Sequence, residues 1–358
     1  MKKIVLTGGG TAGHVTPNIA LIPKLIDKGF EIHYIGSING FEKKLVEDIS
    51  QKYDVKYYGI SSGKLRRQLS FKNVTDAFSV LKGMKDAYFL LKKIKPNVIF
   101  SKGGYVVVPV VLSAKLLKIP VIIHESDYSP GLANKIAIPS SKIVCTTFES
   151  TKKYIKDKKV VCTGSPIRNE VLQGDSIRGK NLCDFKEDKP VILQMGGSQG
   201  SMALNKALRD TLTLGLLKNY NIIHLTGKGN LDNSLKFDNY KQFEYVKDEY
   251  PHLLAYSDFV ISRGGANSIF EFLSIKKPNI IIPLTLKASR GDQIQNAKEF
   301  LEKGYSSVLF EEDLTSDTLF EKIQELSDNK DTYIKNMNTY SKLDTLDQIT
   351  SLLVENAL

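Results

Sequence analysis

TGGGTAGHVTPN, residues 7–18, directly follows the apolar run KKIVL at residues 2–6. A short β-branched run that ends in glycines and continues into an amphipathic stretch predicts a strand, a tight loop and a helix. Gly8, Gly10 and Gly13 have the G-x-G-x-x-G spacing of dinucleotide-binding units, in which glycines let the backbone approach a pyrophosphate. The stretch therefore predicts a Rossmann-like unit at the start of the chain.

The same alternation of strand-like and helix-like stretches continues through the chain, which is typical of βαβ units on a parallel sheet. Strand-like runs in the first half are 2–7, 31–36, 55–60, 97–101, 120–125, 142–147 and 159–164. Those in the second half are 189–196, 220–227, 243–247, 258–264, 278–284 and 306–310. We predict an α/β protein of two Rossmann-like domains, 1–163 and 164–339, with a final helix at about 340–358 that packs back on the first.

Glycine pairs follow three further strand-like runs, in SKGGYVVVP (101–109), VILQMGGSQGSMALN (191–205) and SRGGANSIFEFL (262–273). Ligands of open α/β sheets bind outside the carboxyl ends of the strands, where helix N-termini offer N–H groups to anions. One such loop can be a simple tight turn, but four loops shared by two halves predict a ligand cleft between the domains.

The opening loop lacks a second feature that an NAD site needs. An acidic residue at the end of the second strand binds the ribose hydroxyls, whereas here the run EIHYIGS carries Glu31 at its start and ends in Ser37. His14 directly follows the glycines, where an imidazole is a natural general base near neutral pH. The sequence thus disfavours NAD and leaves two roles open for His14, as a base or as a structural residue that caps or packs the helix.

Positive charge is concentrated in one segment of a chain whose formal net charge is +11. Residues 61–95 hold nine Lys or Arg against two Asp, a net charge of +7. Apolar and basic residues alternate there at near-helical spacing, among them Leu69, Phe71, Phe78, Leu81, Lys82 and Lys85. The segment indicates binding to an anionic membrane surface, with a solvated helix face or ordinary core as the alternatives. The usual nucleic-acid-binding signatures are absent, so we expect no nucleic-acid partner.

The N-terminal apolar run stops at Leu6, which is too short for a signal peptide. Nowhere are 18 consecutive residues apolar, so we expect no membrane-spanning helix. The three cysteines are widely spaced, which argues against disulfides or a zinc site and for a reducing cytosol.

Seven motifs, in order along essentially the whole chain, together resemble the MurG family of peptidoglycan glycosyltransferases. They are GGGTAGHVTPN (8–18), SKGGY (101–105), HESDYSPGLANK (124–135), GSPIR (164–168), GGSQGSMALN (196–205), SRGGANSIFEF (262–272) and RGDQIQNA (290–297). The resemblance implies the GT-B fold, with the acceptor on the N-terminal domain and the donor on the C-terminal one. It implies an inverting transfer of N-acetylglucosamine from UDP-GlcNAc to the C4 hydroxyl of MurNAc in lipid I, which gives lipid II.

The resemblance assigns His14 as the base and also a set of donor-binding residues. Glu271 would bind the ribose, Gln293 the donor sugar and Ser198 the donor phosphate, although Ser198 could equally be a helix N-cap. The expected donor set is Thr11, Ala12, Gly13, Asp127, Arg168, Gly197, Ser198, Gln199, Gly200, Val246, Gly265, Ala266, Asn267, Ser268, Glu271 and Gln293. Asp127 stands where the family commonly has asparagine, and an ionised carboxylate accepts hydrogen bonds but donates none.

The first glycine loop would admit the diphosphate of the lipid acceptor. The expected acceptor set is Gly9, Gly10, Lys102, Gly103, Gly104, Tyr105, His124, Glu125 and Asn134. No D-x-D motif is present, so we expect no metal and no other cofactor, with helix N-termini stabilising the departing UDP. Expected partners are UDP-GlcNAc, lipid I, the anionic surface on the cytoplasmic face of the cell membrane and other cell-wall synthesis proteins.

Three alternatives remain open at this point. A related GT-B enzyme acting on another lipid, such as diacylglycerol, would share the fold and the nucleotide site. A UDP-GlcNAc 2-epimerase would share the architecture without needing a membrane, and a non-catalytic binding protein would bind the nucleotide sugar without turnover.

Overall fold

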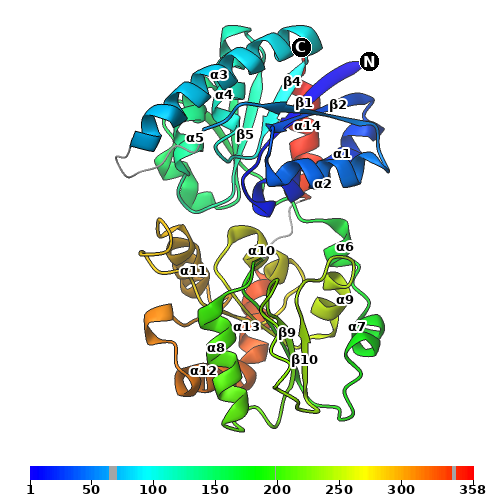
Figure 1. Ribbon diagram of the computed structural model, residues 1–358, viewed down its shortest axis with the longest axis vertical. Coiled ribbons are helices and arrows are strands. Elements are labelled where there is room, and N and C mark those ends of the chain that lie inside the picture. Colours follow the sequence, from blue (N-terminus) through cyan, green and yellow to red (C-terminus); the bar gives the residue numbers. More distant parts are fainter. Residues whose placement is uncertain (64–70, 198, 341–343) are drawn as a thin grey trace. The chain divides into compact units, whose positions relative to one another are not determined.

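The computed structural model describes residues 1–63, 71–197, 199–340 and 344–358. The chain forms two compact units, one of residues 1–168 with 343–358 and one of residues 169–342 (Figure 1). The first unit thus ends at Arg168, five residues beyond the expected 163, and it includes the C-terminal segment.

Unit 1 is built on a seven-stranded parallel sheet of order β3-β2-β1-β4-β5-β6-β7. Its strands are β1 (Lys2–Thr7), β2 (Phe30–Ser37), β3 (Val55–Ile60), β4 (Val98–Ser101), β5 (Val121–Glu125), β6 (Ile143–Thr146) and β7 (Lys159–Cys162). Most strand residues are buried, as expected for a parallel sheet covered on both faces.

Helices cover the two faces of this sheet (Figure 1). The face that includes Ile4 and Leu6 packs against α1 (Ala12–Asp27), α2 (Phe41–Ser50) and α14 (Thr345–Asn356). The opposite face, which includes Val5, packs against α3 (Phe71–Ile94), α4 (Val107–Leu116) and α5 (Leu132–Ala137). The C-terminal helix α14 lies beside α1, where Asp347 pairs with Lys24.

Unit 2 repeats the architecture with a six-stranded parallel sheet of order β10-β9-β8-β11-β12-β13. Its strands are β8 (Val191–Met195), β9 (Asn221–Leu225), β10 (Tyr240–Phe243), β11 (Phe259–Ser262), β12 (Asn279–Ile281) and β13 (Ser307–Val308). Its helices are α6 (Asn169–Leu172), α7 (Ser176–Cys183), α8 (Met202–Thr213), α9 (Tyr250–Tyr256), α10 (Ala266–Ser274), α11 (Asp292–Glu302), α12 (Ser316–Asp328) and α13 (Lys330–Asn338). Two parallel α/β units confirm the predicted fold class.

One predicted strand was wrong. The run 243–247 was expected to form a strand, whereas β10 occupies Tyr240–Phe243 and ends where that run begins. Tyr240 packs into the core of unit 2, while Tyr245 is exposed. Burial of the first tyrosine therefore determines the strand, although the later run is richer in β-forming residues.

The strand order reverses once in each unit, between β1 and β4 and between β8 and β11. Such a reversal separates the loops that follow the two strands and leaves room for a ligand at the carboxyl edge of the sheet. All four glycine-containing loops of the sequence follow these strands. None of the helices described is long and apolar enough to cross a membrane.

Candidate functional site

The loops that follow β1 and β4 in unit 1 contact each other through glycines. The Gly9 amide donates to the Gly103 carbonyl at 3.3 Å. A Cβ atom on Gly104, whose φ is 88°, would lie 2.0 Å from the Gly9 carbonyl oxygen. Only glycine fits this backbone crossing, so the glycines of SKGGY serve to bring the two loops together.

His14 lies in the first turn of α1, at the centre of these loops. Its Nδ1 is 3.0 Å from the Gly9 carbonyl oxygen and 3.1 Å from Thr11 Oγ1. Because a carbonyl only accepts hydrogen bonds, Nδ1 carries the proton and Nε2 holds the lone pair. A Cβ atom on Gly103 would lie 3.5 Å from both His14 Nε2 and Asn134 Nδ2. The fold thus brings together His14, Gly103 and Asn134 from three separate segments.

Lys102 and His124 form a buried pair beneath this site. The Lys102 Nζ donates to His124 Nδ1 at 2.7 Å and also to Ser126 Oγ. His124 Nε2 donates to the Gly164 carbonyl at 2.9 Å. Burial lowers the pKa of Lys102 to about 7, and burial beside Lys102 holds the pKa of His124 well below its usual range. His124 is therefore a neutral imidazole whose two nitrogens are both used within the chain.

Glu125 holds the loop that follows β5. Its carboxylate accepts from the amides of Asp127 at 2.9 Å and Gly131 at 3.0 Å, and from Asn134 Nδ2 at 2.8 Å. The bond to Glu125 fixes the amide orientation of Asn134, so its buried Oδ1 is an acceptor, and it has no hydrogen-bond partner among the described residues.

Three residues of the expected acceptor set hold the loops through internal contacts. The side chains of Lys102, His124 and Glu125 are buried and hydrogen-bonded inside the unit. Their acceptor contacts stay predictions. Tyr105 is half-buried, with its ring where a Cβ atom on Gly10 would point.

Glu42, on α2, reaches the first glycine loop and was missed by the sequence reasoning. Its buried carboxylate accepts from the amides of Ser37 at 2.7 Å and Gly10 at 3.2 Å. The Gly9 and Gly10 amides are therefore bonded within the chain, and the expectation that the first glycine loop admits the lipid diphosphate stays a prediction. The only sequence signal was that Glu42 is an acid in the first turn of the helix after the second strand. Because the Glu42 carboxylate is buried, it does not bind a ribose as the acid of an NAD site would.

Five of the expected donor residues lie in unit 1. Thr11 is the N-cap residue of α1, and Ala12 and Gly13 begin that helix. Asp127 lies in the loop after β5, and Arg168 ends the unit. Their donor contacts stay predictions.

Unit 2 contains a cavity of about 330 Å³ at the carboxyl ends of its strands. It lies beside the N-termini of α8 and α10 and is lined by Met195, Gly196, Gly197, Gly200, Ser201, Ser262, Arg263, Gly265, Ser268, Leu284 and Gln293. Five of the expected donor residues therefore share one cavity: Gly197, Gly200, Gly265, Ser268 and Gln293.

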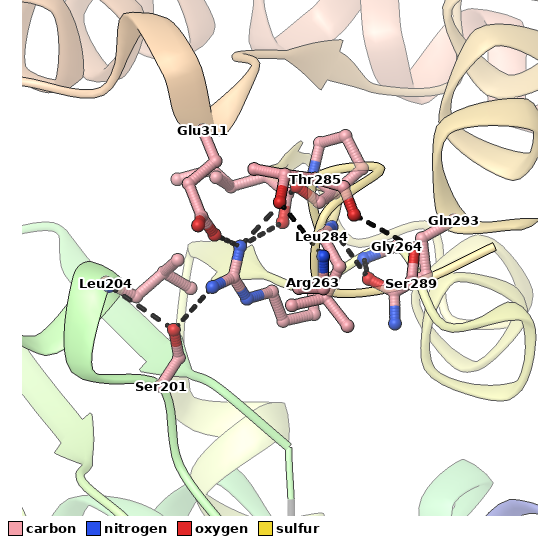
Figure 2. Close-up of polar contacts among 12 residues, drawn as sticks. Ser201, Leu204, Arg263, Gly264, Leu284, Thr285, Ser289, Gln293 and Glu311 are labelled. Carbon is pink, nitrogen blue, oxygen red and sulfur yellow. Dashed lines mark hydrogen bonds and ion pairs between the residues drawn. The ribbon is translucent and has the colours of Figure 1, made fainter. Parts of the chain in front are cut away.

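Gln293 has a fixed orientation in this cavity (Figure 2). Its Oε1 accepts from the amides of Gly264 at 3.2 Å and Leu284 at 3.1 Å. Because both partners are N–H donors, the Gln293 side-chain atom that they contact is the oxygen. The Nε2 group is therefore the end of Gln293 that can donate to a ligand hydroxyl.

Arg263 is a largely buried cation that lines the cavity, with its side chain 11% exposed, and the sequence reasoning did not single it out. Figure 2 shows its guanidinium between Ser201, Glu311 and the chain after β12. It donates to Ser201 Oγ at 2.6 Å and to the Ile282 carbonyl at 3.2 Å, and it pairs with Glu311. Burial lowers the pKa of Arg263, and Glu311 opposes that effect. The sequence feature that could have identified Arg263 is its position directly after strand β11 and before the pair Gly264–Gly265.

The other expected donor residues lie outside the cavity lining. Glu271 accepts from the Tyr250 hydroxyl at 2.9 Å, while Ala266 and Asn267 lie in the first turn of α10. Gln199 is exposed in the second glycine loop, and Val246 lies in the loop after β10. Ser198 is outside the described residues. The N-cap of α8 is Ser201, which accepts from the Leu204 amide.

The described part of the basic segment includes an exposed stripe on α3. Phe78, Leu81 and Phe89 are 68%, 62% and 59% exposed, and Lys82 and Lys85 are exposed beside them. Their spacing places them on one stripe of the helix, so Phe78 and Leu81 are not core residues. Leu69 lies outside the described residues, as does the side chain of Phe71.

The described part of the chain holds no cluster of three or more His, Cys, Asp or Glu side chains arranged to bind a metal ion.

Two family models match the chain, the glycosyltransferase family 28 N-terminal domain over residues 4–146 and the C-terminal domain over residues 191–352. A relative from Clostridium novyi (strain NT) is 56% identical over 353 residues, covering 98% of each chain. It is described as a UDP-N-acetylglucosamine--N-acetylmuramyl-(pentapeptide) pyrophosphoryl-undecaprenol N-acetylglucosamine transferase.

Solved structures share the fold. MurG from Acinetobacter baumannii is 24% identical with a TM-score of 0.76, covering 99% of this chain and 100% of its own. A UDP-GlcNAc 2-epimerase from Neisseria meningitidis is 15% identical with a TM-score of 0.69, covering 99% of each chain. Two enzymes with different reactions therefore have this architecture, and the fold alone does not choose between them. The full-length sequence match does choose: the chain belongs to glycosyltransferase family 28, together with the pyrophosphoryl-undecaprenol N-acetylglucosamine transferases.

Proposed function

We propose that this chain transfers N-acetylglucosamine from UDP-GlcNAc to the C4 hydroxyl of MurNAc in lipid I, giving lipid II. The observation that carries the proposal is the 56% identity, over almost the whole of both chains, to a transferase described by that donor sugar and lipid acceptor. The reaction is a single displacement with inversion, in which the hydroxyl oxygen attacks C1 of the sugar and UDP leaves.

His14 takes the proton from the attacking hydroxyl. The Gly9 carbonyl 3.0 Å from Nδ1 supports this role, because it keeps the proton on Nδ1 and the lone pair on Nε2. His14 is also partly exposed, unlike the buried His124.

The donor binds in the cavity of unit 2. The amides at the start of α8 and α10, with the nearby Arg263, would stabilise negative charge on the departing diphosphate. The Nε2 group of Gln293 would donate to a hydroxyl of the sugar. These groups support a transfer in which the protein itself, without a metal, stabilises the leaving group.

The stripe on α3 binds the cytoplasmic face of the membrane in which the lipid acceptor lies. Three exposed apolar side chains would enter the headgroup region, and lysines on anionic membranes contribute about 1 kcal/mol each. The protein would then be a peripheral enzyme at that surface.

One assay separates this proposal from its alternatives. Purified protein is incubated with radiolabelled UDP-GlcNAc and lipid I, and the label is measured after extraction into an organic solvent. Transfer to the lipid moves label into the organic phase. An epimerase would leave all label in water as an isomerised UDP-sugar, and a binding protein would leave UDP-GlcNAc unchanged. Diacylglycerol in place of lipid I tests the related lipid glycosyltransferase.

A further inference from the structure

Glu42 is a buried carboxylate inside the loop that carries His14. It lies on α2 and is fully buried, and its carboxylate accepts hydrogen bonds from two backbone amides. Oε1 accepts from the Ser37 amide at 2.7 Å and Oε2 from the Gly10 amide at 3.2 Å. Burial of a charge is costly unless it is hydrogen-bonded, so a carboxylate at this position needs an explanation.

The surrounding backbone is shaped around this carboxylate. A Cβ atom on Gly9 would lie 2.6 Å from Glu42 Oε1, and one on Gly40 would lie 2.2 Å from the same oxygen. A Cβ atom on Gly36 would lie 2.8 Å from Cγ. Three glycines from two different segments thus leave room for the Glu42 side chain, and any larger residue at these positions would clash with it.

Glu42 and His14 bind the two ends of a single peptide group. The peptide between Gly9 and Gly10 donates its N–H to Glu42 Oε2, and its carbonyl oxygen accepts from His14 Nδ1 at 3.0 Å. Hydrogen bonds in a chain polarise one another, and an anionic acceptor gives the stronger bond. The carboxylate therefore makes the Gly9 carbonyl a better acceptor for the imidazole N–H.

We propose that Glu42 is a positioning residue for His14, acting through the Gly9–Gly10 peptide to hold the imidazole proton on Nδ1 and present Nε2 to the substrate hydroxyl. The inference rests on the proposed function, in which His14 is the base. Glu42 touches neither substrate, so its effect reaches the reaction only through the ring.

Other charged and titratable groups lie on the elements packed around the loop. They are Tyr34 on β2, Tyr57 on β3, Lys102 and Tyr105 after β4, and Glu125 at the end of β5. A substitution of Glu42 leaves all five in place, so a change in His14 is then attributable to Glu42.

The test is nitrogen NMR of the histidine rings in the full-length protein, with the His14 signal assigned from its loss in His14→Ala. In the wild type we expect neutral His14 to carry its proton on Nδ1. In Glu42→Gln we expect a larger Nε2–H fraction and a ring titration midpoint at lower pH, because a negative charge that favours the imidazolium is gone. With lipid I and UDP-GlcNAc, kcat should fall about tenfold or more, as for other groups that orient a reacting side chain, with KM for UDP-GlcNAc unchanged.

Glu47→Gln is the matched control, since Glu47 lies on the same helix and is 57% exposed. It should alter neither the ring signal nor kcat. Glu42→Asp, which keeps the charge on a shorter arm, should restore part of the Nδ1–H population. Should Glu42→Gln fail to fold, the wild-type tautomer and Glu42→Asp still decide the question.

A wild-type His14 with its proton on Nε2, or a ring signal that is identical in Glu42→Gln and the wild type, would overturn the inference. The NMR readout needs no turnover. A wild-type protein that shows the expected tautomer but moves no label to lipid would refute the proposed function and leave the Glu42–His14 coupling standing.

Discussion

Lys102 is a buried amine with two neutral hydrogen-bond partners, His124 and Ser126. Burial lowers its pKa from 10.5 to about 7, with Glu125 and Asp127 opposing the shift. At a pH between these two pKa values, the Lys102 amine is protonated in the unfolded chain and deprotonated in the folded chain. Because the unfolded state then binds more protons, the free energy of unfolding rises with pH across this window.

Lys102→Met should remove that pH dependence. The free energy of unfolding of the wild type should rise relative to the variant as the pH is raised from about 7 to 10, by a few kcal/mol at most. Denaturant titrations at a series of pH values measure it. Lys115→Met, at an exposed position on α4, should show a constant difference from the wild type. A constant difference for Lys102→Met as well would mean that the amine is not held at a lowered pKa.

The contacts of Arg263 with Glu311 and Ser201 predict how its loss affects stability and UDP binding. Arg263→Leu leaves Glu311 without its cation and Ser201 without a donor, which should destabilise unit 2 by about 3 kcal/mol and weaken UDP binding. The combination with Glu311→Leu should recover stability but not UDP affinity, since the positive charge is still missing. Thermal unfolding and UDP titration calorimetry measure the two effects, with the exposed Arg178→Leu as control. Full recovery of UDP affinity in the double variant would limit Arg263 to a structural role.

Single residues were predictable where a motif marks the end of a strand. His14 and the glycines of both units were found in this way, because strand ends in a parallel sheet meet at one edge, whereas Gln293 was assigned by the family resemblance. Glu42 and Arg263 were missed because their roles depend on partners far away in sequence, Gly10 for one and Ser201 for the other. The burial of Lys102 and His124 was not predicted, since a motif does not show which side of a loop is buried.

At the scale of elements, hydrophobic patterning predicted nearly all of the strands, because each parallel strand is a short apolar run closed by a turn. It failed for 243–247, where one buried tyrosine upstream determines β10. It predicted a helix or loop with near-helical spacing over the basic segment, and the structure shows a helix whose Phe78 and Leu81 are exposed.

The α3 stripe gives a prediction at this scale. Serine at Phe78, Leu81 and Phe89 should weaken binding to vesicles that contain anionic lipid, because about 1.5–3 kcal/mol is available from each apolar side chain that leaves water. Flotation of the protein with vesicles measures it, and UDP affinity should not change. Leu214→Ser, at a similarly exposed position in unit 2, serves as the control. Equal flotation of the triple variant and the wild type would show that the stripe does not bind membranes.

The whole molecule consists of two parallel α/β units, each with glycine loops where its strand order reverses. This architecture was predictable from the repeated strand–glycine–helix pattern. It does not identify the reaction, because a transferase and an epimerase both have it. The reaction follows from the sequence match across both units, and the chemistry from the side chains at the strand ends.

The central claim is that His14 accepts the proton during sugar transfer to the lipid, and one comparison tests it most directly. His14→Ala and the wild type are assayed for radiolabel moved from UDP-GlcNAc into extracted lipid, and their affinities for UDP are measured alongside. We expect His14→Ala to lose turnover by about 10²- to 10⁴-fold, the usual contribution of a general base, with UDP affinity retained in unit 2. Undiminished turnover in His14→Ala would contradict it.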